Sequence, residues 1–255
     1  MGWRRYWDII IYRTYAELKA EAQLSYMGYV WWVLEPLLNT VLFFVIMAVV
    51  LEQSTVDAVA FLVIGAVTWQ WFNASMMSAS NSVIDAGSML KQIYLPKAVL
   101  PLISIFSGTW KFMFLFVLLL VITWSTGHAP SIAYLALPIV LVLEFLAIVA
   151  FTMPLAFIMP YFPDARVTVD AFLRCAMLIS GIFFPVAALP HVYQVYFHLN
   201  PLADLIEAYR AILINKSWPR WDLMAYVFIL SLVGMGIAAL IHKRVDRSMV
   251  KAIHR

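Results

Sequence analysis

The chain has 255 residues, of which 64% are hydrophobic and only 12% are charged, and its net charge is +3. Soluble domains are about 45–50% apolar and about 25% charged, so this composition excludes a soluble globular domain and a disordered chain. A single cysteine excludes a disulfide framework, and the basic residues flank apolar runs instead of forming the stripe of a nucleic-acid-binding protein. We therefore predict an all-α integral membrane protein, with residues 1–255 forming one transmembrane domain.

Residues 1–29 predict an amphipathic helix that lies in the membrane interface. Apolar and charged residues fall on opposite sides of this helix. The apolar side carries Trp3, Tyr6, Trp7, Ile10, Ile11 and Leu18, and the charged side carries Arg4, Arg5, Asp8 and Lys19. The alternative is a soluble linker. A cleavable signal peptide is not expected, because charges occur throughout this segment and the first apolar run is long enough to span the membrane.

Six apolar stretches are long enough to be membrane-spanning helices, since about 20 apolar residues cross the hydrocarbon. They are Val30–Leu51, Val59–Met77, Ala98–Trp124, Ile132–Met159, Val167–Ala188 and Leu223–Ile241. These runs do not alternate as the strands of a membrane barrel do. The predicted plan is therefore spans one to five over 30–188, short outer helices over 189–221, the sixth span over 222–242 and a tail over 243–255. The fifth span is the least apolar, because Asp170 and Arg174 lie in its first turns.

The basic residues predict the orientation of the chain. Six crossings leave both termini on one side of the membrane. Thirteen of the 17 Lys and Arg residues fall on that side, in the two terminal segments, between spans two and three and around the start of span five. By the positive-inside rule this side is the cytoplasmic one, so both termini are expected in the cytoplasm.

The connection Ser78–Lys97 is too long for a simple turn. It predicts a short amphipathic helix that protrudes into the cytoplasm and docks a partner there. Its candidate contact residues are Asp85, Lys91, Tyr94 and Leu95. The alternative is a solvated loop.

The connection Pro185–Asp222 lies on the outer face and is unusually apolar for a loop. Two aromatic residues, Tyr193 and Tyr196, precede an Asn-Pro pair. Asn200 suits a helix N-cap and Pro201 the first helical position, which predicts a helix over Leu202–Lys216. We expect two short helices resting in the outer interface, and composition leaves open whether they form a lid or fill packing gaps.

Two ionisable residues lie within predicted spans, where charge is costly. Lys111 lies mid-span in the third helix and Glu144 mid-span in the fourth, at equal distances from the turn near Gly127. They are therefore predicted to lie at the same depth and to form an intramembrane ion pair. This pair either fixes helix packing or takes part in a proton relay.

No catalytic or nucleotide-binding motif is found in the sequence. There is no Gly-x-x-x-x-Gly-Lys-Ser/Thr segment, and the five histidines show no metal-ligand spacing. We expect no catalytic residue, no metal and no cofactor bound by this chain.

Aromatic residues are the most prominent remaining feature. Trp31 and Trp32 open the first span, as interfacial anchors do. A stripe of flat rings near polar residues is a candidate track for sugars, formed by Trp32, Trp69, Trp71, Phe72, Phe183 and Phe184. The alternative is that these rings pack against other helices and lipid.

Several segments taken together resemble the permeases of polysaccharide-exporting ABC transporters. They are Tyr26–Leu37 (YMGYVWWVLEPL), Ile93–Lys97 (IYLPK), Tyr161–Arg166 (YFPDAR), and Asn200-Pro201 followed by Glu207–Arg210 (EAYR). These segments cover nearly the whole chain, in order and with the right number of spans. Each is weak alone, and together they are fairly specific.

The resemblance implies a homodimer in the bacterial inner membrane that encloses a channel, with two cytoplasmic ABC ATPase subunits that bind ATP and Mg²⁺. It implies that Ser82–Pro96 is the coupling helix that receives the ATPase movement. The interfacial helix becomes a lateral portal element, and the outer short helices with Tyr193, Tyr196, Asn200 and Pro201 become an outer gate.

The implied substrate is a glycan such as O-antigen, capsule or teichoic acid, carried on undecaprenyl pyrophosphate. Cations are available for the pyrophosphate at Arg4, Arg5, Arg13 and Arg166. The alternative role of these residues is to anchor the topology. Two alternative functions are a proton- or ion-coupled secondary transporter that uses Lys111 and Glu144, and a membrane enzyme acting on lipid-linked sugars.

Overall fold

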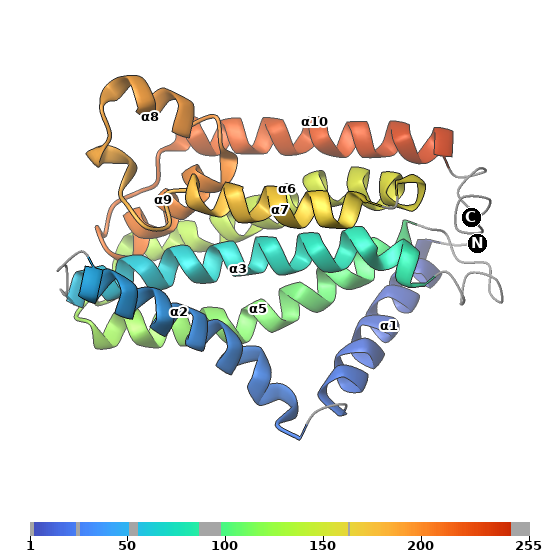
Figure 1. The fold of residues 1–255 in the computed structure, drawn as a ribbon, viewed down its shortest axis with the longest axis horizontal. Coiled ribbons are helices and arrows are strands. Elements are labelled where there is room, and N and C mark those ends of the chain that lie inside the picture. Colours follow the sequence, from blue (N-terminus) through green and yellow to red (C-terminus); the bar gives the residue numbers. More distant parts are fainter. Residues whose placement is uncertain (1–2, 24–25, 51–55, 87–97, 163, 246–255) are drawn as a thin grey trace.

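The computed structural model describes residues 3–23, 26–50, 56–86, 98–162 and 164–245, and every regular element in this part of the chain is helical. The α-helices are α1 (Trp3–Gln23), α2 (Trp31–Val50), α3 (Val56–Asp85), α5 (Val99–Ser125), α6 (Leu137–Ile158), α7 (Ala165–Leu178), α8 (His191–Phe197), α9 (Pro201–Leu213) and α10 (Trp221–Val245). Short 3₁₀ turns are η1 (Gly28–Val30), η2 (Ile132–Ala136), η3 (Met159–Tyr161) and η4 (Val186–Ala188). The prediction of an all-α chain is confirmed for these residues (Figure 1).

Four helical segments in the described part are long and apolar enough to cross a membrane. They are Asp57–Asp85, Val99–Ser125, Ile132–Tyr161 and Trp221–Arg244. They correspond to predicted spans two, three, four and six. Predicted span two is longer than expected, because α3 continues past Met77 to Asp85. Residues 78–85 of the predicted cytoplasmic connection are therefore part of α3.

The predicted fifth span is wrong in length. α7 has 14 residues, about 21 Å of helix, which is shorter than the hydrocarbon thickness of about 30 Å. The chain turns after α7 at Gly181, whose φ of +69° is a conformation that glycine adopts without strain, and Pro185 follows. α2 is helical over 20 residues of the predicted first span. Six crossings therefore remain a prediction.

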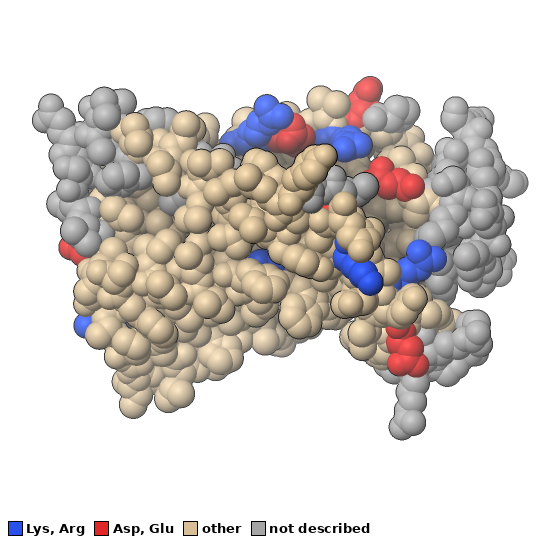
Figure 2. All heavy atoms as spheres, turned by 90° about the horizontal axis from the view of Figure 1, so that it is seen from below, with Lys and Arg blue, Asp and Glu red and all other residues tan. Residues whose placement is uncertain are grey.

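The long helices run along one axis of the molecule (Figure 1). The start of α1 and the end of α10 lie at the same end of this axis, whereas α8 and α9 lie at the opposite end. This arrangement agrees with an even number of passes between α1 and the end of α10. On the face seen in Figure 2, charged side chains gather mainly toward the end at which α1 begins.

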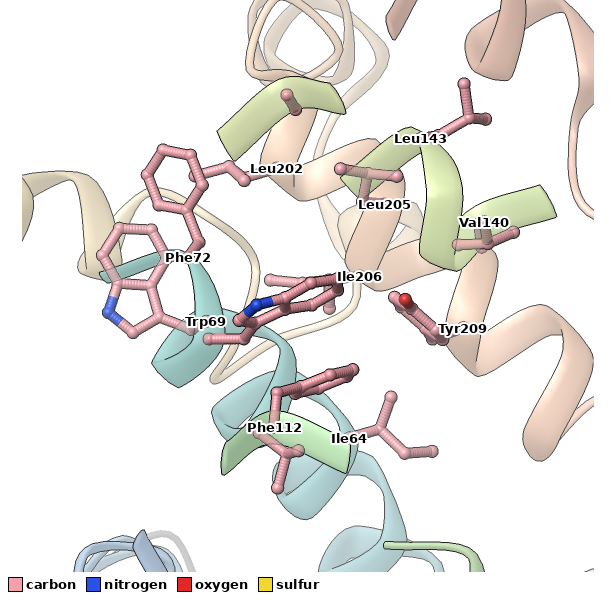
Figure 3. Close-up of a cluster of buried hydrophobic side chains, with 14 of the residues drawn as sticks. Ile64, Trp69, Phe72, Phe112, Val140, Leu143, Leu202, Leu205, Ile206 and Tyr209 are labelled. Carbon is pink, nitrogen blue, oxygen red and sulfur yellow. The ribbon is translucent and has the colours of Figure 1, made fainter. Parts of the chain in front are cut away.

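α9 is the most deeply buried of the short helices, and this differs from the prediction. Nearly all of its residues are buried, and it packs against α3, α6 and α10 instead of resting in the outer interface. Leu202, Leu205 and Ile206 of α9 meet Val140 and Leu143 of α6 in one apolar cluster (Figure 3). By contrast, none of the seven residues of α8 is buried.

The predicted cap of α9 is confirmed. The Leu202 backbone N–H donates to Asn200 Oδ1 at 3.1 Å, and Pro201 occupies the first turn. The Asn200 side chain also donates to Ser180 Oγ at 3.1 Å, which ties the start of α9 to the segment after α7. The helix ends at Leu213, close to the predicted end at Lys216.

Candidate functional site

Two consecutive residues of α9 hold this helix inside the bundle. The first is Tyr209, whose hydroxyl donates to Glu144 Oε2 of α6 at 2.8 Å. Both side chains are fully buried, and Glu144 Oε1 has no hydrogen-bond partner among the described residues. A carboxyl group buried within a membrane protein costs free energy if it has no hydrogen-bond partner. The hydrogen bond from Tyr209 to Glu144 therefore attaches α9 to α6 at a specific point.

The second is Arg210, which binds backbone carbonyls of two other segments. Its guanidinium donates to Gly181 O at 2.6 Å, to Ile182 O at 2.8 Å, and to Phe61 O of α3 from Nε at 3.3 Å and from Nη2 at 3.2 Å. The guanidinium also lies 3.3 Å from the centre of the Phe61 ring. Burial lowers the pKa of Arg210 to about 9, so the group stays charged at neutral pH. Arg210 thus joins α9 to α3 and to the turn after α7.

Gly65 of α3 leaves the space that Arg210 occupies. A Cβ atom at this position would lie 2.7 Å from Arg210 Nη2 and 3.3 Å from Ile182 Cα. We expect Gly65→Ala to lower the free energy of unfolding by about 1–3 kcal/mol, because the guanidinium must move away from its carbonyls. Denaturation of the purified protein in detergent measures this change.

Gly236→Ala of α10 is the matched control for that substitution. A Cβ at Gly236 meets nothing within 4 Å among the described atoms, and alanine favours a helix over glycine. We expect this variant to be as stable as the parent or slightly more so. Equal losses in both variants would contradict a specific role for the space at Gly65.

The predicted ion pair between Lys111 and Glu144 is wrong. Lys111 Nζ lies 2.7 Å from Glu21 Oε1 of α1 and 5.4 Å from the centre of the Trp32 ring, whereas Glu144 accepts from Tyr209. Equal distance from the connecting turn predicts equal depth, but it does not predict which side of each helix faces inward. α5 directs Lys111 toward α1, and α6 directs Glu144 toward α9.

A second contact supports the attachment of α1 to α5. The Ser107 hydroxyl donates to Glu17 Oε2 at 3.1 Å, one turn from the contact between Lys111 and Glu21. Ile10 of α1 is also buried against Val99 and Ile103 of α5. The amphipathic helix is thus confirmed as a helix, and it packs along the described part of α5.

Three of the six predicted sugar-track residues lie in the protein core. Trp69, Trp71 and Phe72 of α3 are 5%, 3% and 3% exposed. The Trp71 ring stacks on Phe112 of α5, with 4.0 Å between centroids and 11° between planes. Figure 3 shows Trp69 and Phe72 beside residues of α9. The structure thus shows that these three rings pack inside the helical bundle of this chain.

The other three rings are half-buried. Trp32 packs against Phe114 of α5, and Phe184 lies edge-on to Phe197 of α8 at 5.4 Å. Phe183 packs against the main apolar cluster. The tyrosines predicted for the outer gate, Tyr193 and Tyr196, are exposed on α8. The structure therefore does not bring the six predicted rings together into one stripe.

The predicted coupling residues lie only partly within the described chain. Asp85 is exposed at the end of α3, while Lys91, Tyr94 and Leu95 lie outside the described residues. The end of α3 and the start of α1 lie at the same end of the bundle (Figure 1).

Of the four predicted pyrophosphate contacts, the structure describes the side chains of Arg13 and Arg166. Arg13 lines a pocket of about 540 Å³ between α1, α3 and α5, but Glu17 and Asp85 line it too. Arg166 is exposed at the start of α7. Arg4 and Arg5 lie in the first turns of α1, and their side chains are outside the described set.

Sequence reasoning assigned no role to Tyr209, Arg210 or Gly65, although the first two lie in the segment EAYR quoted for the resemblance. One signal was present: an arginine among apolar residues of a short helix predicts a buried partner. The partners are backbone carbonyls, which no side-chain pattern reveals.

Known proteins resemble this chain over most of its length. The family described as ABC-2 type transporter matches residues 13–214. The O-antigen export system permease protein RfbA of Myxococcus xanthus is 24% identical, over 84% of both chains, and a protein of the same name from Klebsiella pneumoniae is 23% identical over 90% of both. The polysialic acid transport protein KpsM of Escherichia coli is 25% identical over 88% of both chains.

Proposed function

Because this chain belongs to the ABC-2 type transporter family and is a permease of the polysaccharide-export kind, we propose that it exports a lipid-linked polysaccharide as half of a homodimeric channel. The channel is powered by two separate cytoplasmic ABC ATPase subunits. The proposed membrane is the bacterial inner membrane, with both termini in the cytoplasm. The proposed carrier is undecaprenyl pyrophosphate, and the proposed polymer is of the O-antigen or capsule type.

The observation that carries this proposal is the match to polysaccharide permeases. The match covers most of this chain and most of each of those relatives. The sequence itself supports a separate motor, because it contains no phosphate-binding Gly-x-x-x-x-Gly-Lys-Ser/Thr loop. ATP and Mg²⁺ therefore belong to the partner subunit in this proposal.

The described helices support a mechanical route from the motor to the outer end. α3 runs without interruption over 30 residues, and it ends at Asp85, directly before the connection proposed to touch the ATPase. Near its other end, Phe61 accepts hydrogen bonds from Arg210 of α9. A movement imposed at the end of α3 is thus passed along one rigid helix to α9, which is the kind of rigid-body transition that transporters use.

Charged substitutions in the connection test the docking role. We expect Tyr94→Glu combined with Leu95→Glu to reduce export of surface polysaccharide at least tenfold, because charges in an apolar contact prevent docking. Membrane insertion, measured by fractionation, is expected to be unchanged. Export is measured by labelling surface polysaccharide in cells that lack the chromosomal copy and carry the variant.

The matched control is Lys243→Glu combined with Arg244→Glu, two exposed residues at the same end of the bundle. This control introduces two negative charges and also removes two positive ones, a larger change of charge, and we still expect it to leave export near the parental level. Normal export by the Tyr94 and Leu95 variant would contradict the docking role.

Purification tests the proposed assembly directly. We expect the tagged permease, extracted in mild detergent, to bring down an ATPase subunit that has a phosphate-binding loop. The variant that carries Tyr94→Glu and Leu95→Glu is expected to purify without this ATPase subunit. ATP hydrolysis by the isolated permease, without any other subunit, would overturn the proposal.

A further inference from the structure

Three side chains at the outer end of the bundle bring metal-binding atoms together. His198 follows α8, and Asp204 and Glu207 lie one turn apart on the same side of α9. One ligand atom of each residue lies within 4.8 Å of the others. His198 Nδ1 and Asp204 Oδ1 are already 2.6 Å apart. The export function proposed above makes no use of this cluster.

Two carboxylate oxygens of the cluster lack partners. Asp204 is 1% exposed, and its Oδ2 atom is buried with no hydrogen-bond partner among the described residues. Glu207 Oε2 is also buried and also has no hydrogen-bond partner among the described residues. Both residues line a pocket of about 430 Å³ between α9 and the start of α10. Buried carboxylates without a donor are stabilised by pairing or by coordinating a metal ion.

We propose that His198, Asp204 and Glu207 form a binding site for a divalent transition-metal ion, for which Zn²⁺ is the best fit. One imidazole nitrogen with two carboxylate oxygens is a donor set that Zn²⁺ accepts, and it leaves a position open for water. Ca²⁺ and Mg²⁺ prefer oxygen donors alone, so the histidine disfavours them. Binding of the ion replaces the hydrogen bond between His198 Nδ1 and Asp204 Oδ1.

The cations that line the same pocket are engaged elsewhere. Arg210 donates to three backbone carbonyls, and Arg220 Nη2 lies 2.7 Å from Asp222 Oδ2. Neither guanidinium donates to the two orphaned carboxylate oxygens. Their positive charge nevertheless lies close to the site and weakens cation binding, so we expect an affinity in the micromolar range. A bound ion joins the end of α8 to α9.

The test uses the full-length chain in detergent, purified with a tag that contains no histidine and treated with a chelator. We expect one Zn²⁺ per chain by calorimetric titration, with elemental analysis after desalting as a second measurement. His198→Gln, Asp204→Asn and Glu207→Gln are each expected to weaken binding at least tenfold. Asp204 is buried, and a substitution there can prevent folding. His198 is only half-buried, so we expect His198→Gln to fold and to test the site in that case.

The matched control is His191→Gln, which changes an exposed histidine at the same end of the molecule. This variant is expected to bind Zn²⁺ as the parent does. Zn²⁺ is also expected to raise the melting temperature of the parent and not that of His198→Gln. The proposal is overturned by absence of stoichiometric binding, by equal binding in His198→Gln, or by Ca²⁺ binding more tightly than Zn²⁺. Loss of export in the Tyr94 and Leu95 variant tests the permease function and does not depend on this site.

Discussion

Replacing Arg210 by leucine is expected to lower the free energy of unfolding by at least about 3 kcal/mol and to abolish export. The substitution removes the donors for Phe61 O, Gly181 O and Ile182 O, and it leaves Gly181 O and Ile182 O without partners among the described residues. Each buried polar group left without a partner costs about 1–3 kcal/mol. α9 then loses its attachment to α3 and to the turn after α7. Denaturant or thermal unfolding in detergent measures the stability, and surface labelling measures export.

Two other substitutions make the role of Arg210 specific. Arg210→Lys keeps the charge but not the planar set of donors, so we expect an intermediate loss of stability. Arg220→Leu removes an exposed arginine that lines the same pocket, and we expect a change of no more than about 0.5 kcal/mol. A stability of Arg210→Leu equal to that of Arg220→Leu would show that α9 is held by its apolar contacts alone.

Truncating Trp71 to alanine is expected to destabilise the protein by about 3–5 kcal/mol. The ring is 3% exposed and stacks on Phe112, so its removal leaves a cavity between α3 and α5 that the surrounding helices fill only in part. In lipid the loss is mainly one of van der Waals contacts, because helix association there depends on close packing. Unfolding in detergent measures the effect.

The comparison with Trp110→Ala and Trp71→Phe separates packing from a role in transport. Trp110 of α5 is 57% exposed, and we expect its truncation to cost much less than that of Trp71. Trp71→Phe keeps a stacking ring and removes an indole N–H that has no partner in the described structure, so its cost is expected to be small. Export lost in Trp71→Ala at unchanged stability would instead place the ring in the polymer path.

Much of the local structure was predictable from residues alone. Four spans, the helical N-terminal segment and the cap of α9 at Asn200 agree with the structure. Each of these features depends on short-range physics. A helix in lipid satisfies its own backbone hydrogen bonds, and a capping side chain reaches only its own helix.

The errors concern how the helices contact one another. The depth of Lys111 and Glu144 follows from counting residues, but their partners depend on how α5 and α6 are rotated about their axes. The fifth span was predicted to be longer than α7, because the run of apolar residues continues past Gly181. The backbone nevertheless turns at Gly181, and the helix ends before it. α9 was expected at the surface, since its 13 residues are too few to span, yet it lies inside the bundle.

The sequence by itself determined that this chain is helical, lies in a membrane and resembles polysaccharide permeases, because composition and the period of apolar residues are properties of short segments. Only the tertiary structure decided that Tyr209 and Arg210 attach α9 to α6 and α3, and that His198 lies beside Asp204 and Glu207. The contacts of Tyr209 and Arg210 join residues that are far apart in the chain. The contacts of His198 depend on the path of the backbone between α8 and α9. Their partners include main-chain carbonyls, which every residue carries and no sequence pattern distinguishes.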